Sequence, residues 1–184
     1  AENYVISATG GFRVGEADTA QISETEGSYR LLYGSLAYTR PLGKKLLFET
    51  NVIGQYADGE NLPVARLFTG GGPDILRGYP NNVRSGDSGF VARLQLSGRE
   101  AISLVESDLK ARPFGFLDVG LIVPFRPDGG IESDQDFLAS AGAGTRISYR
   151  DNASMLLMAG LPLRETLGFD DRSATVYFGL DYTF

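Results

Sequence analysis

The chain has 184 residues and a net charge of −6, which suits one domain and, since no basic run is present, argues against binding nucleic acid through its phosphates. No stretch approaches the roughly 20 consecutive apolar residues that a membrane-spanning helix needs. Cysteine and histidine are both absent, which excludes disulfides, thiol catalysis and histidine general bases, so we expect neither an enzyme nor a bound cofactor.

The rest of the composition favours strands over helices. The chain holds 24 glycines, 9 tyrosines and 11 phenylalanines, a balance typical of turns, strands and bands of aromatic side chains. Eight segments alternate apolar residues with small or polar ones, which is the period of a β-strand. In chain order the predicted strands cover residues 4–14, 29–40, 45–57, 89–97, 114–123, 137–149, 155–163 and 173–184.

Three of the first four predicted strands precede the long connection at residues 58–88, and the fourth follows it. The alternation is least regular in residues 4–14 and 29–40, and a turn at residues 41–44 joins the second strand to the third. The third strand sets an apolar row opposite Glu49, Asn51 and Gln55. The fourth sets Phe90, Ala92, Leu94 and Leu96 opposite Val91, Arg93, Gln95 and Ser97.

The last four predicted strands alternate more cleanly. In the fifth, Asp118 falls on the polar face, with Leu117 and Val119 on the apolar one. A tight turn at residues 150–152 joins the sixth strand to the seventh as a hairpin. The final strand is the most regular, with an apolar row made of Ala174, Val176, Phe178, Leu180, Tyr182 and Phe184.

Such strands fit either a soluble sandwich, whose apolar face is internal, or a membrane barrel, whose apolar face meets lipid. The connections favour the barrel, because the long ones at 15–27, 58–88 and 126–136 alternate with short ones and so fall on one side of the sheet. We predict an all-β fold: a membrane antiparallel up-and-down β-barrel, one domain over residues 1–184, in contact with lipid or detergent. A soluble binding barrel is the alternative.

The connection at residues 58–88 is far longer than most loops, so we expect it to be functional or disordered. Its composition favours order. Three consecutive glycines, Gly70, Gly71 and Gly72, allow a close-packed turn, and a cation stands beside an aromatic ring in Leu76, Arg77, Gly78 and Tyr79.

Residues 54–96, GQYADGENLPVARLFTGGGPDILRGYPNNVRSGDSGFVARLQL, resemble the two-partner secretion transporters (TpsB) of the haemolysin and filamentous-adhesin secretion type. In that family the loop folds into the barrel lumen, and its tip arginine pairs with an aspartate in a Phe-x-Asp-x-Gly strand pattern. The segment Phe116-Leu117-Asp118-Val119-Gly120 matches this pattern. The resemblance therefore implies a lumenal ion pair between Arg77 and Asp118, since neither charge is tolerated alone when buried.

The end of the chain provides a second match. A terminal Phe184 preceded by alternating aromatic residues such as Tyr182 resembles the signal by which barrels are delivered to the outer-membrane assembly machinery. The resemblance implies that this machinery is a partner and that the bacterial outer membrane is the location.

Relative to the family, the sequence lacks the plug helix, the two POTRA domains and the first eight of sixteen strands. We therefore expect a C-terminal half-barrel, derived from a protein-translocating pore, that cannot secrete alone and meets a secreted exoprotein only in the full-length context. It either closes as an eight-stranded barrel or pairs with a second copy into a sixteen-stranded homodimer. A stand-alone barrel with a structural or adhesive surface role is the alternative.

Other interpretations of single features are weaker. Arg77 alone would be taken for a surface-loop arginine. The pair Gly142 and Gly144 lies inside a predicted strand, so close packing is favoured over a nucleotide-binding turn. The acidic run Glu132, Asp134 and Asp136 lacks the spacing of an EF-hand, which favours a solvated loop over a calcium site, and we predict no metal.

Overall fold

The computed structural model describes residues 3–17, 27–59, 62–105, 108–123, 136–150, 152–166 and 172–183. Within these residues no helix is long and apolar enough to cross a membrane. Three residues singled out in the sequence, Glu132, Asp134 and Phe184, lie outside the described ranges.

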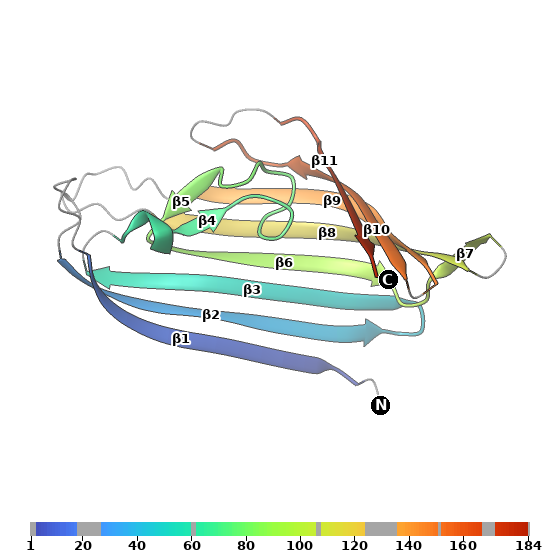
Figure 1. Ribbon diagram of the computed structural model, residues 1–184, viewed down its shortest axis with the longest axis horizontal. Helices are drawn as coiled ribbons and strands as arrows, with labels where there is room; N and C mark the ends of the chain where they lie inside the picture. The colour runs from blue at the N-terminus through green and yellow to red at the C-terminus, as the bar shows by residue number, and fades with distance from the viewer. Residues whose placement is uncertain are drawn as a thin grey trace.

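One antiparallel sheet contains all of the long strands that the structure describes (Figure 1). Its order is β1-β2-β3-β6-β8-β9-β10-β11, so each long strand pairs with the next long strand along the chain. The prediction of an all-β, up-and-down arrangement of eight long strands is confirmed. Their bounds are Val5–Ala17 (β1), Gly27–Leu42 (β2), Leu46–Gly59 (β3), Ser88–Gly98 (β6), Leu109–Val123 (β8), Asp136–Tyr149 (β9), Ala153–Pro162 (β10) and Thr175–Tyr182 (β11).

The fifth predicted strand was too short at its start. The predicted strand began at residue 114, whereas β8 begins five residues earlier, at Leu109. Pro113 is tolerated because it faces a gap in the ladder: β6 pairs with β8 only up to Phe114, and the short strand β7, Ile102–Val105, resumes the pairing at Ala111. A proline there removes no hydrogen bond on that side.

The sheet has two free edges. β1 and β11 stand at opposite ends of the strand order, and no pairing joins them among the described residues. The eight strands therefore form a partial barrel, and closure into a ring is not part of this structure. Figure 1 shows the sheet curving, with β10 and β11 turned back over the face on which the β3–β6 connection lies.

The two faces of the sheet have opposite chemistry. In β11, Val176, Phe178 and Leu180 are each about two-thirds exposed, whereas Tyr177 between them points into the concave face. The same alternation in β10 exposes Leu157 and buries Met158. The convex face is thus apolar, which is the reverse of a soluble protein, and the predicted division of each strand into two faces is confirmed.

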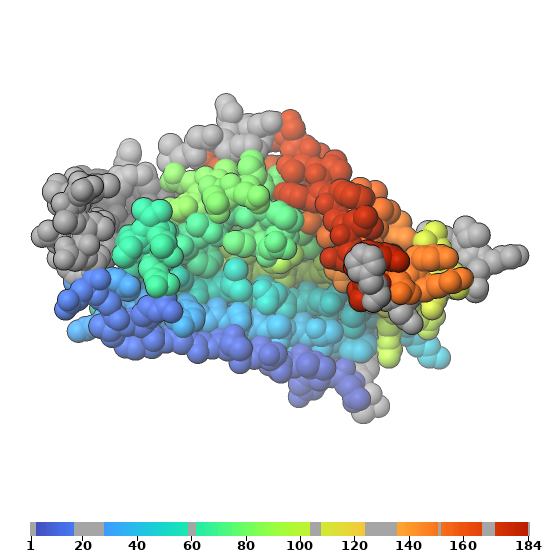
Figure 2. Space-filling model, viewed as in Figure 1, coloured from blue at the N-terminus to red at the C-terminus, as the bar shows by residue number. Residues whose placement is uncertain are grey.

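The largest buried apolar cluster lies between the sheet and the connection from β3 to β6. We call residues 62–87 of this connection the inner loop. Its Leu76 and Tyr79 are fully buried against Val91, Ile122 and Leu138 of the sheet. Burying side chains of this size contributes about 1.5–3 kcal/mol each, so the loop itself supplies the core of the fold. Figure 2 shows the loop's atoms, in green, filling the hollow of the sheet.

The inner loop contains short elements that periodicity did not predict. They are the 3-10 turn η1, Val64–Arg66, and the two-stranded ribbon of β4, Phe68–Gly70, with β5, Arg84–Gly86. Each spans three residues, which is too short for an alternation to be recognised.

Aromatic side chains on the concave face pack over glycines of the neighbouring strand. Phe116 of β8 lies over Gly142 of β9, where a Cβ would come within 2.4 Å of the ring and 2.1 Å of the Ala159 carbonyl oxygen. Phe114 covers Gly144 in the same way. The two glycines therefore serve close packing inside a strand, as their position in the sequence favoured.

We predict that Gly142→Ala destabilises the sheet by about 1–3 kcal/mol, because its Cβ cannot be accommodated without displacing Phe116 or the β10 backbone. The control is Gly115→Ala, since the nearest atom to a Cβ there is 3.8 Å away. Urea unfolding followed by circular dichroism should show a lower midpoint for Gly142→Ala and a change within about 0.5 kcal/mol for Gly115→Ala. Equal effects would contradict the packing.

Candidate functional site

The inner loop folds back sharply so that its tip, Arg77-Gly78-Tyr79, meets the wall of the sheet. Gly71 and Gly72 have φ angles of 101° and 94°, which other residues rarely adopt. A Cβ at Gly71 would lie 2.1 Å from the Pro80 carbonyl oxygen, so the two arms of the loop touch. The Gly72 amide donates to the Tyr79 carbonyl at 3.0 Å and fixes the width of the loop.

The tip is bound to β8 by a buried ion pair. Arg77 donates from Nε to Asp118 Oδ2 at 2.8 Å and from Nη2 to Oδ1 at 2.7 Å, and its backbone amide also reaches Oδ2 at 3.0 Å. The two side chains are 3% and 0% exposed. The guanidinium also stacks 3.8 Å from the centre of the Phe116 ring. The structure thus brings together the two residues that the family resemblance paired.

A chain of polar side chains continues from the ion pair across the inner wall. Arg77 Nη1 donates to Gln95 Oε1 at 2.7 Å, and Gln95 Nε2 donates to Glu49 Oε2 at 3.1 Å. Ser97 donates to the same carboxylate oxygen at 3.0 Å. All three terminal nitrogens of Arg77 are therefore engaged, and the network links the loop to β3 and β6 as well as β8.

The loop backbone also lies directly on β10 and is held by β11. Gly78 has a φ of 95°, and a Cβ at Gly160 would lie 2.7 Å from the Gly78 nitrogen. Tyr177 Oη accepts from the Gly78 amide and donates to the Tyr79 carbonyl, both at 3.0 Å. Thr175 donates to the Gly78 carbonyl at 3.1 Å. Only glycines at both contact points permit this approach.

Tyr79 anchors the far side of the tip. Its hydroxyl lies 2.9 Å from the Ala139 carbonyl and 2.7 Å from the Arg164 carbonyl, and accepts from the Ala139 amide at 3.3 Å. Burial raises the pKa of the Tyr79 phenol, outweighing the backbone hydrogen bonds that lower it. The phenol therefore stays protonated and donates at neutral pH.

The other predicted loop residues fill apolar contacts. Leu76 packs on Gly120, where a Cβ would lie 2.7 Å from Leu76 Cδ1, and Gly70 faces Ile122 and Leu138. Tyr182, from the proposed assembly signal, is 61% exposed on the outer face of β11 and lies away from this site.

Two acidic residues fasten the base of the loop. Asp87 Oδ1 accepts from the Leu62 amide at 2.7 Å, which joins the incoming and outgoing arms. Asp136 lies 2.9 Å from Arg84 Nε and accepts from the Thr166 hydroxyl. Asp136, from the acidic run noted in the sequence, thus pairs with Arg84 of the inner loop.

Several of these partners were missed from the sequence. Tyr177, Gly160, the Gln95–Glu49 link and Arg84–Asp136 all depend on which residues of different strands face one another. For Tyr177, Gly160, Gln95 and Glu49 the available signal was a place on the polar face of a predicted strand, whereas Arg84 and Asp136 lay in predicted connections and gave none.

The chain matches the family model of the haemolysin secretion/activation proteins ShlB/FhaC/HecB over residues 3–147. It belongs to this family, which comprises two-partner secretion (TpsB) proteins. Among solved structures the chain is similar to CdiB from Escherichia coli, with a TM-score of 0.81 and 21% identity. The match covers 98% of this chain and 34% of that one, so the chain spans about a third of the CdiB length. No curated protein sequence matches it.

At 21% identity the likeness to CdiB concerns the fold alone. A TM-score of 0.81 over 98% of the chain supports the curved antiparallel sheet described above. The ShlB/FhaC/HecB family is one of protein transporters, and the site described above has the character of a structural anchor: a buried ion pair, an apolar plug and close backbone packing.

We predict that Asp118→Asn lowers the free energy of unfolding by about 3–5 kcal/mol, because it leaves the Arg77 guanidinium buried without a counter-charge. The matched control is Asp58→Asn, whose exposed carboxylate lies 3.9 Å from Arg30, with an expected effect below about 1 kcal/mol. Urea unfolding and limited proteolysis of the inner loop provide the measurements.

The reciprocal exchange of Arg77→Asp with Asp118→Arg should not restore stability, because the Arg77 backbone amide and Gln95 would then face the wrong partners. Full recovery in the exchanged protein would show that the geometry of the pair is unimportant.

We predict that Tyr177→Phe increases cleavage of the inner loop and costs about 1–3 kcal/mol, since the Gly78 amide and Tyr79 carbonyl lose their common partner. Tyr56→Phe is the control, because that ring is 62% exposed on the outer face. Limited proteolysis with mass-spectrometric mapping of the cuts measures the effect. Unchanged loop cleavage in Tyr177→Phe would mean that β11 does not hold the tip.

Proposed function

We propose that the chain is part of the wall of a protein-translocating pore in the bacterial outer membrane. The observation that carries this is the reversed polarity of the sheet, with an apolar convex face and a polar concave face to which the inner loop is bound. Membership of the ShlB/FhaC/HecB family supports translocation as the activity.

The convex face supports a membrane location. A membrane-crossing strand needs about 9–11 residues, and most of the long strands reach or exceed this length. Their outward side chains are apolar over several neighbouring strands, as Phe12, Leu32, Leu157 and Phe178 illustrate. A soluble barrel would pay a large hydration cost for this surface, so its exposure weighs against the soluble alternative.

The free edges support a larger barrel. Unpaired edge strands are unsuited to lipid, so β1 and β11 need partners. Closure of these eight strands on themselves leaves an interior filled by side chains, without room for the inner loop on the concave face. We propose that further strands, as in a sixteen-stranded barrel, complete the wall, and that the eight strands alone do not secrete. A second copy is the other candidate.

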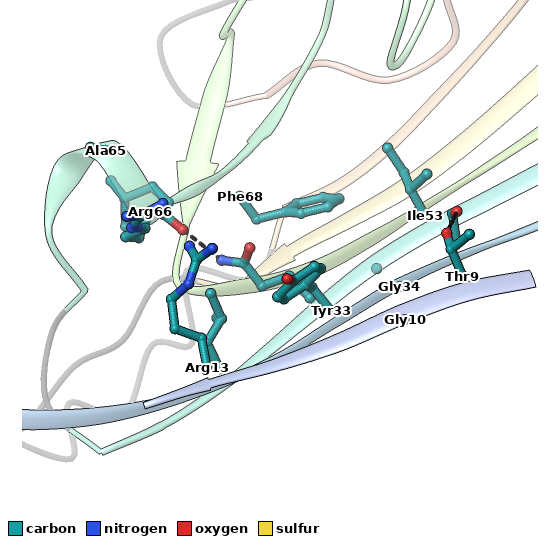
Figure 3. A pocket seen from close by; sticks show the side chains of 14 residues that line it. Thr9, Gly10, Arg13, Tyr33, Gly34, Ile53, Ala65, Arg66 and Phe68 are labelled. Carbon is teal, nitrogen blue, oxygen red and sulfur yellow. Dashed lines mark hydrogen bonds between the residues drawn. The ribbon is translucent and has the colours of Figure 1, made fainter. Parts of the chain in front are cut away.

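A cavity beside the inner loop supports a path for a polypeptide along the concave face of the sheet. It has a volume of about 490 Å³ and lies between the loop and the concave face of β1, β2 and β3. Figure 3 shows Arg13 and Tyr33 of the strands and Phe68 of the inner loop around it. The tip of the loop is fastened to β8, β9, β10 and β11, whereas this cavity lies against β1, β2 and β3. A secreted polypeptide would pass there in the complete pore.

Two further partners belong to this proposal. The assembly machinery of the outer membrane would recognise the last strand, whose outward row includes Phe178, Leu180 and Tyr182. A secreted exoprotein would be the cargo of the complete transporter. A stand-alone adhesive role would have to rest on residues 18–26 and 124–135, which lie outside the described ranges.

We predict opposite reactivity for two adjacent positions, tested in outer-membrane vesicles with a membrane-impermeant maleimide. The chain has no cysteine, so Ser35→Cys and Leu36→Cys each introduce a single thiol. Ser35 lines the inner cavity and should react, whereas Leu36 faces outward and should react only after detergent is added. Rapid labelling of Leu36→Cys in intact vesicles would contradict the membrane location.

A further inference from the structure

A second cavity, of about 190 Å³, lies between the tip of the inner loop and the wall, on the side of the short turns. Four arginines line it: Arg77, Arg93, Arg112 and Arg146. The first is neutralised by Asp118, and Arg93 donates to the carbonyls of Pro73 and Asp74. The remaining two arginines have a different environment.

Arg112 of β8 and Arg146 of β9 are direct cross-strand neighbours. Both have the parity of the concave face, since Asp118 lies six residues beyond Arg112 and Gly142 lies four before Arg146. Like charges directly opposite each other destabilise a sheet. Among the described residues neither guanidinium forms an ion pair, whereas Arg150, beyond the end of β9, is paired with Asp108 at 2.9 Å.

Among the described residues neither acidic side chain of the cavity forms an ion pair with Arg112 or Arg146. Glu49 accepts from Gln95 and Ser97, and the backbone carbonyl of Asp74 accepts from Arg93. Two like charges beside a cavity favour the binding of an anion. The bound anion reduces their repulsion and accepts hydrogen bonds from both guanidinium groups.

We infer that Arg112 and Arg146 form a binding site for a carboxylate carried by a polypeptide segment in the lumen. Phe114, Leu156 and Met158 also line the cavity and provide an apolar wall for the stem of an aspartate or glutamate side chain. A free inorganic ion has no apolar part that could pack against these side chains. That the occupant is a polypeptide rests on the proposed function, whereas the binding of an anion does not.

The test uses the chain within its complete barrel, purified in detergent with ¹⁵N-labelled arginine and observed through the arginine Nε–Hε signals. The probes are sulfate, the peptide acetyl-Gly-Ser-Glu-Ser-Gly-amide and the same peptide with Gln in place of Glu. Sulfate and the Glu peptide should shift the Arg112 and Arg146 signals, and the Gln peptide should not. The Arg30 and Arg150 signals should stay in place.

Variants then test the assignment. Arg112→Gln and Arg146→Gln should each weaken the Glu peptide about tenfold or more, while Arg30→Gln leaves its affinity unchanged. Their urea midpoints should be equal to or above that of the parent, because the repulsion is removed.

Three results would overturn the inference. Absence of any shift in the unsubstituted protein excludes an anion site without reference to a variant. A response to sulfate alone excludes a peptide carboxylate, and equal responses to both peptides exclude recognition of the acidic group. The maleimide labelling of Ser35→Cys and Leu36→Cys is independent of all three, so it reports separately on the membrane pore.

Discussion

The burial of Arg77 against Asp118 constrains the rest of the structure. A guanidinium removed from water needs a partner in fixed geometry, and Asp118 provides both oxygens while also accepting the Arg77 backbone amide. That contact places Gly78 on Gly160, which is possible only because neither residue carries a side chain. The ion pair, the glycine contact and the Tyr79 anchor therefore specify one position of the loop. Their role is positional, since a buried pair contributes little net stability compared with an apolar replacement.

The inner loop takes the place that a second sheet or a helix layer has in soluble proteins. Its Leu76 and Tyr79 form the centre of the apolar core, while the convex face of the sheet remains uncovered. A wall of this kind is stable in lipid only if its edges are paired, and its loop needs an interior wider than eight strands provide. Loop and edges are thus two independent observations behind the proposal that further strands complete the wall.

The sequence predicted the strands because lipid-facing and inner residues alternate with a period of two, which is visible within a single segment. Parity also placed Asp118 on the inner face, but its pairing with Arg77 required the family resemblance. Other contacts could not be predicted, because strand register and the path of the inner loop determine which residues are neighbours. These include the contacts of Tyr177 and Gly160 with the loop and the cross-strand pair of Arg112 and Arg146. The strands β4 and β5 were not predicted because each has only three residues, which is too few to show an alternation of apolar and polar side chains.

A double-mutant cycle on Arg77→Leu and Asp118→Leu tests the central claim most directly. If the two charges hold the loop through each other, the second substitution removes the isolated buried charge left by the first. The double variant should then be more stable than the sum of the single losses predicts, with a coupling of about 2 kcal/mol or more in urea unfolding. Additivity within about 0.5 kcal/mol would show that the two charges act independently, and the account of the anchored inner loop would be wrong.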